Sequence, residues 1–303
     1  MNAPAPLGVV GHYNLLEALD ASGPGDLYRA RDTHHGRTVI VRWLPREYAA
    51  DPAARRTLLD AARGTAALSH PNVTTLFEVG EHDGRVYLAF EFLTGRTLRA
   101  EMAGRPMNMR RALETAIQIG DAVAEAHAAG FAHGGLSPES VTITSRGHAK
   151  IPAFPLAVRS GFAASATSDD VRLEDYESPE EARGEPPDDR SDVYSVGAIL
   201  YEMLAAKRPS HRGAAAPGAA NVHVPGAIDD VVLKAVAPNP ALRYQSMAAL
   251  VAALRWLSST FDAHGFADDE LVAGPSRGRV VPLVAGTLAL VAAAAVFWWL
   301  TRP

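Results

Sequence analysis

Residues 190–209 read RSDVYSVGAILYEMLAAKRP, and this stretch decides the class of fold. Its apolar side chains recur at helical spacing over the length of one long helix, and Pro209 stands where such a helix must end. The same spacing fills 109–130, which ends on a glycine, and it returns in 228–237 and 246–257. The second part of the chain is therefore predicted to consist of helices.

The first part of the chain holds short runs of strand-forming residues instead. The sequence HDG at 82–84 lies between alternating apolar residues, which is typical of a hairpin. One helix is expected to interrupt these strands, because Asp51 is a suitable N-cap and Pro52 suits the first helical turn. The strand pattern stops near Leu93, so a strand-rich part is expected to precede the helical part.

Composition excludes several classes of function. The chain has 303 residues, a net charge of -5 and no cysteine, which rules out a disulfide framework, a thiolate metal site and a cysteine nucleophile. The acidic balance offers no clustered basic surface, so no nucleic-acid partner is expected. The 11 histidines are scattered, and no His/carboxylate spacing places ligands on one helical face. No metal site built from side chains is expected.

Residues 280–300, VVPLVAGTLALVAAAAVFWWL, carry no charge and are long enough to cross roughly 30 Å of hydrocarbon as a helix. Trp298 and Trp299 stand at one end, where aromatic belts lie, and Arg277 and Arg279 precede the stretch. A buried core helix is the competing interpretation, but a soluble helix of this length normally has a polar face. The stretch therefore predicts a single membrane span.

The position of this span predicts a C-terminal tail anchor that leaves residues 1–279 in the cytoplasm. The polar stretch 258–279 is interpreted as a juxtamembrane linker. Ala285, Ala289 and Ala293 form a small-xxx-small stripe, which suggests that the span packs against a second copy to form a homodimer.

Six segments within residues 13–257 stand out, in the order LYRARD, LSHPNV, VYLAFEFLTGRTL, YESPEEARGE, RSDVYSVGAILYEMLAAKRP and NPALRYQS. Each resembles a motif of the bacterial serine/threonine protein kinase family, and their order is that of the family. The resemblance implies an α+β, two-lobed fold, with an antiparallel β N-lobe (13–93) that holds one helix and a helical C-lobe (94–257).

The family's structural positions are occupied. The resemblance implies that Glu180 and Arg243 form a buried ion pair in the helical lobe. It also implies that Asp192 holds the backbone of the catalytic loop and that His133 opens this loop. Phe154 matches the phenylalanine of the family's metal-binding motif. These residues support folding rather than chemistry.

The family's catalytic loop is not matched at its reacting positions. Family members read His-Arg-Asp-Leu-x-Pro-Glu-Asn where this chain reads HGGLSPES. Gly135 stands at the base aspartate, Ser137 where a lysine usually meets the phosphate, and Ser140 at the metal-binding asparagine. Glycine has no group that accepts a proton.

The other chemical positions differ as well. The metal-binding Asp-Phe-Gly motif is replaced by AFP, which begins at Ala153, and alanine cannot coordinate magnesium. Arg42 occupies the position of the phosphate-gripping lysine and has a longer, planar head. Ala61 stands where the family has the glutamate that orients this lysine, and the neighbouring Asp60 points about 100° away on a helix.

The glycine-rich loop of the family is also only partly matched. Asp20, Ser22 and Gly25 stand at its three glycine positions. An aspartate that faced nucleotide phosphates would repel them. Gly23 and Gly25 are candidate nucleotide contacts, and the alternative is that they serve only a hairpin turn.

The residues together predict a membrane-anchored pseudokinase. No cofactor is expected. The predicted role is binding of a protein partner, either an active kinase or its substrate. One alternative is an active atypical kinase that binds nucleotide through Arg42 and the backbone near Glu91. Another is a switch that binds ATP without magnesium. Nucleotide binding decides between these hypotheses.

Overall fold

The structure is a computed structural model in which two stretches of the chain form the expected lobes. The ranges described are 6–19, 27–44, 68–152 and 175–264, with the single residues 56, 59, 62, 64 and 66. The expected order of a strand-rich part followed by a helical part is confirmed within these residues.

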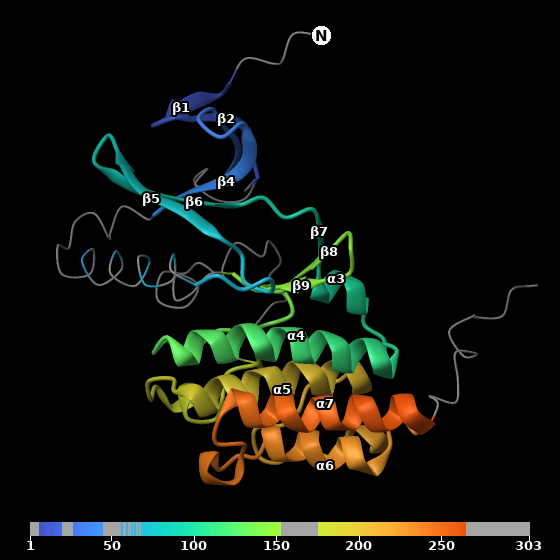
Figure 1. Cartoon of the computed structure of the whole chain (residues 1–303). Helices are drawn as coiled ribbons and strands as arrows, with labels where there is room; N and C mark the ends of the chain where they lie inside the picture. The colour runs from blue at the N-terminus through green and yellow to red at the C-terminus, as the bar shows by residue number, and fades with distance from the viewer. Residues whose placement is uncertain are drawn as a thin grey trace, which may run out of the picture. The chain divides into compact units, whose positions relative to one another are not determined.

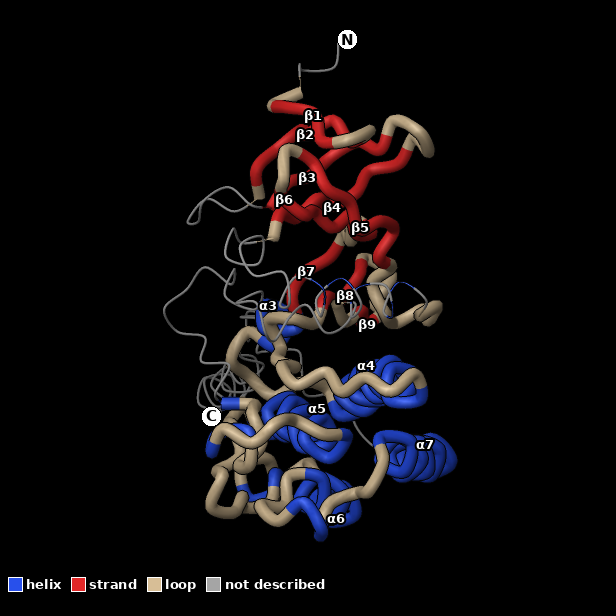
Figure 2. The backbone as a smooth tube through the Cα atoms, turned by 90° about the vertical axis from the view of Figure 1, so that its left-hand side faces the viewer, coloured by secondary structure: helices blue, strands red, loops and turns tan. Residues whose placement is uncertain are grey.

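The N-lobe is a six-stranded antiparallel sheet in the order β1-β2-β3-β4-β6-β5 (Figures 1 and 2). Its strands are β1 (Gly8–Val10), β2 (Tyr13–Ala18), β3 (Leu27–Asp32), β4 (Arg37–Trp43), β5 (Leu76–His82) and β6 (Arg85–Glu91). The predicted hairpin joins β5 to β6, because His82 pairs with Arg85. Asp83 and Gly84 both have positive φ, of 49° and 72°, as a two-residue type I′ turn requires.

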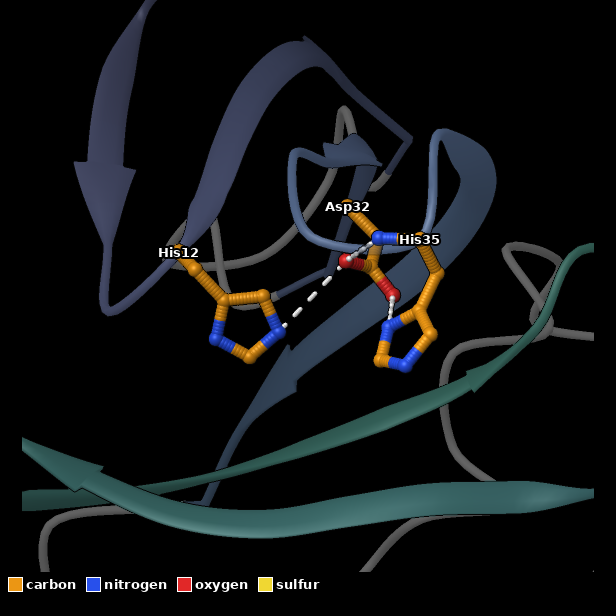
Figure 3. Close-up of side chains that lie close together, drawn as sticks. All are labelled: His12, Asp32 and His35. Atoms are coloured by element: carbon orange, nitrogen blue, oxygen red, sulfur yellow. Dashed lines mark hydrogen bonds and ion pairs between the residues drawn. The ribbon is translucent and has the colours of Figure 1, made fainter.

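A buried carboxylate organises the turn between β3 and β4. Asp32 is completely buried, and its Oδ1 accepts hydrogen bonds from the N–H groups of His34 and His35, each at 3.0 Å. Its Oδ2 accepts one from Arg37 Nε at 3.0 Å and contacts the His35 ring (Figure 3). Burial by itself raises the pKa of Asp32, but these hydrogen bonds outweigh burial and lower the pKa to about 2.

The C-lobe consists of helices that pack around one core, beside a small three-stranded sheet. The helices are α3 (Leu98–Met102), α4 (Met109–Ala128), α5 (Asp189–Ala205), α6 (Gly226–Ala235) and α7 (Met247–His264), with single 3-10 turns at Glu181–Arg183, Pro217–Ala219 and Pro240–Leu242. The strands are β7 (Gly95–Thr97), β8 (Thr142–Thr144) and β9 (Ala149–Lys150).

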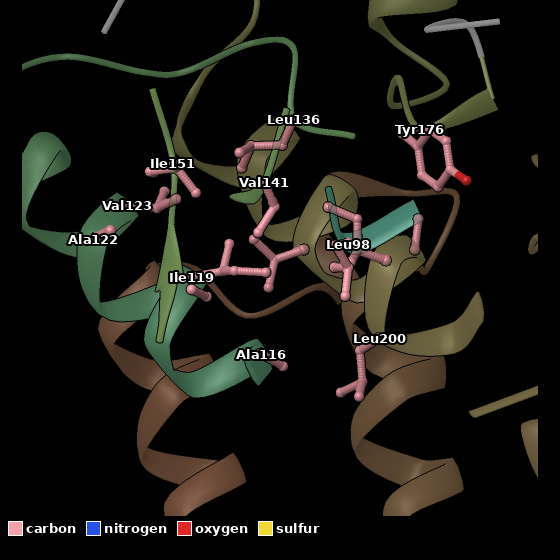
Figure 4. Packing of buried hydrophobic residues seen from close by; sticks show 14 of the residues in the cluster. Leu98, Ala116, Ile119, Ala122, Val123, Leu136, Val141, Ile151, Tyr176 and Leu200 are labelled. Carbon is pink, nitrogen blue, oxygen red and sulfur yellow. The ribbon is translucent and has the colours of Figure 1, made fainter. Parts of the chain in front are cut away.

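The long helix predicted from the opening stretch is α5, and it is buried on every side from Ser191 to Ala205. Asp188 and Ser191 form a capping box that fixes where it begins. Figure 4 shows how Ile119 of α4 lies close to Val141 in the core. Because α5 runs through the middle of this core, side chains at its N-terminal end can reach the loops that carry the site.

Glu180 and Arg243 form a buried, bidentate ion pair. Arg243 Nη1 donates to Glu180 Oε1 at 2.6 Å, and Nη2 donates to Oε2 at 2.8 Å. Arg243 also donates to the carbonyl oxygens of Ala237, Arg190 and Pro238. Burial raises the pKa of a carboxyl group, but the bonds from Arg243 hold the pKa of Glu180 below its ordinary value. The pair ties the segment before α5 to the segment before α7.

One predicted boundary is wrong and others fall outside the described residues. The linker expected at 258–279 does not begin at 258, because α7 continues to His264 and Phe261 packs against the core. Among the described residues, no helix is both long and apolar enough to cross a membrane. The predicted span at 280–300, with its alanine stripe, lies outside them. Residues 56, 59, 62, 64 and 66 are helical, as expected for the N-lobe helix.

Replacing Glu180 by glutamine should lower the free energy of unfolding by about 3 to 5 kcal/mol, because the charge of Arg243 then stays buried without its counter-ion. Urea unfolding of the full chain measures this. Glu185→Gln is the matched control, since Glu185 forms an exposed pair with Arg183 and should cost less than about 1 kcal/mol. Equal losses in the two variants would contradict the prediction.

The contribution of Asp32 to stability should depend on pH. Its pKa is lower in the folded chain than in the unfolded chain, so the stabilisation is complete above about pH 4 and disappears as the pH falls towards 2. Asp32→Asn should therefore cost roughly 2 kcal/mol at pH 7 and much less near pH 2.5. Urea titrations of both proteins in metal-free buffer test this. A gap that stays constant with pH would contradict it.

Candidate catalytic site

The carboxylate of Asp192, near the start of α5, holds the loop that begins at His133. It is completely buried and accepts hydrogen bonds from His133 N at 2.6 Å and from Gly134 N at 2.7 Å. A third contact, at 2.7 Å, joins it to Nε2 of His127 at the end of α4. Both oxygens of the Asp192 carboxylate thus contact the loop, and one of them also contacts α4. These contacts fix the loop relative to α4 and α5.

Gly134 has a structural reason to be glycine. Its φ is +54°, in the left-handed region that favours glycine, and a Cβ there would lie 2.6 Å from Cγ of Pro187. The family has arginine at this position, whereas the backbone of this loop does not fit an L side chain here. The sequence alone gave no reason for this glycine.

His133 lies at the core side of the loop and is 2% exposed. Burial is the largest influence on this ring and lowers its pKa to about 4, against the opposing pull of the Asp192 charge. The imidazole is therefore neutral at pH 7. The ring lies in the buried interior of the protein.

Gly135, Ser137 and Ser140, the three positions of this loop at which the family's catalytic residues are replaced, lie together. Gly135 is buried and has no side chain. Ser140 Oγ donates to Ser137 O at 2.8 Å and accepts from Ser137 N at 3.1 Å, so its hydroxyl closes a local turn. Ser137 is 1% exposed, and its own hydroxyl makes no hydrogen bond. The described loop thus presents no carboxylate or amide at these positions.

Arg99 of α3 joins the end of this loop to the helical core. Its Nε donates to Glu139 Oε1 at 2.5 Å, and its Nη1 donates to Glu202 Oε1 at 2.7 Å. Tyr176 Oη bonds to both Arg99 and Glu202. Burial lowers the pKa of a guanidinium, but the bonds to Glu202 and Glu139 raise the pKa of Arg99 above its ordinary value. Sequence reasoning missed this network because no local spacing connects its members.

Glu91, a candidate nucleotide contact, is engaged within the protein. Its N–H donates to Thr75 O at 2.9 Å, and its Oε2 accepts from Lys150 Nζ at 2.6 Å. Lys150 lies in β9, three residues before the position of Ala153. The N–H group and the carboxylate of Glu91 itself are therefore bonded within the protein, while the backbone next to Glu91 stays a predicted nucleotide contact.

Arg42 lies in β4, where it pairs in register with Leu27 of β3 and Leu88 of β6 and is half-buried. The remaining site residues predicted from the sequence lie outside the described residues. They are Gly23, Gly25, Ala61, Ala153 and Phe154, together with Asp60 beside Ala61. The structure thus brings together the positions of the C-lobe loop and leaves the nucleotide-facing ones untested.

Three curated relatives match most of this chain. A probable serine/threonine-protein kinase of Streptomyces coelicolor is 33% identical over 267 residues, which cover 81% of this chain and 39% of the relative. PknB of Mycobacterium tuberculosis is 33% identical over 276 residues, covering 84% and 44%. PrkC of Bacillus subtilis is 29% identical over 270 residues, covering 84% and 41%. The chain spans less than half the length of these relatives.

The fold is similar to that of a solved structure, the kinase domain of Mycobacterium tuberculosis PknI. The TM-score is 0.66 at 22% identity, and the match covers 84% of this chain and 99% of that one. The protein kinase domain family matches residues 13–239, which is most of the described chain. This chain therefore belongs to the protein kinase domain family and is related to bacterial serine/threonine-protein kinases.

Proposed function

We propose that this chain is a pseudokinase, a kinase-fold signalling module that does not transfer phosphate. The observation that carries the proposal is Gly135. Asp192 holds the loop in which the family places its base aspartate, yet residue 135 has no side chain that accepts a proton. The scaffold of a catalytic site is retained while the reacting group is missing.

The residues at the metal positions do not fit magnesium. Mg²⁺ is bound in such sites through carboxylates and substrate phosphates, in an octahedron of oxygen atoms. Ala153 has no donor atom, and the hydroxyl of Ser140 is bonded to the backbone of Ser137. We therefore assign no step to a magnesium nucleotide.

The number of charged catalytic groups that are replaced supports the absence of phosphate transfer. Phosphoryl transfer depends on positioned charges around the phosphates, the metal and the hydroxyl nucleophile. Removing one electrostatic stabiliser typically costs about two to three decades in rate, and here the base and the metal ligands are replaced together. Arg42 keeps a positive charge, but a guanidinium supplies no acceptor oxygen and no base.

The proposed action is binding of a protein, either an active kinase or its substrate, through the surfaces of the two lobes. A kinase fold without transfer acts through its shape, and the polar contacts of Glu180 with Arg243 and of Arg99 with Glu202 support a C-lobe of defined shape. The uncharged stretch 280–300 supports attachment to a membrane by one helix, with the kinase fold on the cytoplasmic side and a second copy as a partner of that helix.

The alternative function is an active, atypical serine/threonine kinase. The names of the relatives favour it, because the proteins from Streptomyces, Mycobacterium and Bacillus are all described as serine/threonine-protein kinases. In this chain it would depend on Arg42 as the one charged residue retained at a phosphate-facing position. A third possibility, a switch that binds ATP without magnesium, rests on the same residue.

The full chain, purified in detergent, should incorporate no phosphate from labelled ATP into itself or a generic protein substrate, with Mg²⁺ or Mn²⁺ present. Arg42→Ala is the matched variant, since it removes the charge on which the active alternative depends. Its signal should equal that of the natural chain. Incorporation by the natural chain that Arg42→Ala abolishes would refute the pseudokinase proposal.

Millimolar ATP should leave the thermal unfolding midpoint of the full chain unchanged, with or without magnesium. The measurement is sensitive, because a ligand at 100 times its dissociation constant adds about 2.7 kcal/mol of stability. A rise that needs no magnesium would establish the nucleotide-binding switch. A rise that requires magnesium and disappears in Arg42→Ala would support the active kinase.

A further inference from the structure

Three potential metal ligands meet at the N-lobe sheet, away from the catalytic loop. His12 lies in the turn between β1 and β2, Asp32 is the last residue of β3, and His35 lies in the turn between β3 and β4 (Figure 3). One ligand atom from each lies within 4.8 Å of the others. Figure 3 shows both imidazole rings directed at the Asp32 carboxylate from opposite sides.

His35 Nδ1 lies 3.0 Å from Asp32 Oδ2, at hydrogen-bond distance, whereas the spacing around His12 Nε2 matches a coordination shell better than a hydrogen bond. His12 Nε2 is buried and has no hydrogen-bond partner. It lies 3.5 Å from Asp32 Oδ1 and 3.6 Å from Glu78 Oε2. Two ligands of a tetrahedral zinc ion are about 3.3 Å apart, given metal–ligand distances near 2.0 Å. The nitrogen therefore faces two carboxylates at a distance that suits a shared ion.

The two turns are held together before any ion binds. Thr33 donates to the carbonyl oxygen of His12 through its N–H at 3.1 Å and through Oγ1 at 2.8 Å. Gly11 has a φ of +56°, and a Cβ there would lie 2.9 Å from Oη of Tyr87. These contacts fix the position of the His12 backbone, from which its side chain extends. An ion would therefore enter a largely preformed site.

The carboxylates also have the outer partners that metal ligands usually have. Arg37 Nε donates to Asp32 Oδ2 at 3.0 Å. Tyr13 and Tyr87 donate to the two oxygens of Glu78, at 2.9 Å and 2.6 Å. Such hydrogen bonds orient ligating groups and raise the affinity for the ion. One positive charge from Arg37 against two carboxylates leaves a net negative site for a cation.

We propose that His12, Asp32 and His35 bind a divalent transition-metal ion of the zinc class, with Glu78 or a water as the fourth ligand. Two imidazoles with carboxylate oxygens are a donor set that suits zinc and is unsuited to magnesium or calcium. The side chain of His35 is 63% exposed, which gives the ion a path from solvent. The ion clips the β1–β2 turn to the β3–β4 turn and stabilises the N-lobe sheet.

The sequence predicts no metal site, because no His/carboxylate spacing places ligands on one helical face. The ligands come instead from two turns that only the antiparallel pairing of β2 with β3 brings together, with Tyr13 opposite Asp32. The competing explanation is a set of ion pairs between Asp32 and protonated histidines, which needs no metal.

The test is zinc binding by the full chain in detergent, stripped of metal with a chelator and followed by calorimetric titration and thermal unfolding. We expect one zinc per chain and a higher unfolding midpoint. His12→Ala with His35→Ala should weaken binding at least about 100-fold, more than the loss of an outer-shell partner explains. His148→Ala with His223→Ala is the matched control, because both residues are exposed and lie in the C-lobe.

His35→Ala alone removes an exposed side chain and keeps the test decisive if the double variant does not fold. Cobalt in place of zinc should give the visible absorption of a tetrahedral site, and this absorption should be lost in the variant. Absence of zinc binding, or binding that survives in the double variant, would overturn the proposal in favour of ion pairs alone. Neither outcome bears on phosphate transfer, which concerns other residues.

Discussion

The buried carboxylate of Asp192 is the interaction on which the described site depends. An unpaired charge in this position would be very costly, so its donors are not optional. Two consecutive backbone N–H groups, of His133 and Gly134, and the ring of His127 satisfy it. The path of the loop is therefore set by α5 and α4. Nothing in this arrangement requires a particular side chain at residue 135.

Structure and chemistry are separable in this fold for that reason. The Glu180–Arg243 pair is buried and the Arg99 network is partly buried, and loss of one partner of the Glu180–Arg243 pair would leave an uncompensated buried charge. These interactions maintain the C-lobe whether or not the loop carries a base. The catalytic positions of the loop that begins at His133 make no buried ion pair of this kind. Gly135 has no side chain, and the hydroxyl of Ser140 bonds only to the backbone of Ser137. Their replacement leaves the fold intact, which is the physical basis of the proposed loss of phosphate transfer.

Asp32 has a role in the N-lobe that resembles the role of Asp192 in the C-lobe. Each carboxylate is completely buried and accepts two backbone N–H groups, and each contacts a histidine. The surroundings differ, because Asp32 contacts the exposed ring of His35 and, with a second carboxylate, Glu78, lies close to Nε2 of His12. The proposed ion would bind at Nε2 of His12, the atom of this cluster that makes no hydrogen bond.

The sequence by itself determined the order of the two lobes, the long helix α5, the β5–β6 hairpin and the residue types of the loop that begins at His133. Local spacing was enough for α5 and for the hairpin at Asp83 and Gly84, since helix and turn patterns depend on near neighbours. The glycine at residue 135, where the family has its base aspartate, can likewise be read from the sequence at that one position. Tertiary structure alone decided the Arg99 network and the His12 cluster, and it carried α7 past residue 258. Those features arise when segments far apart in the chain pack together, and no local pattern records which distant side chains will then meet.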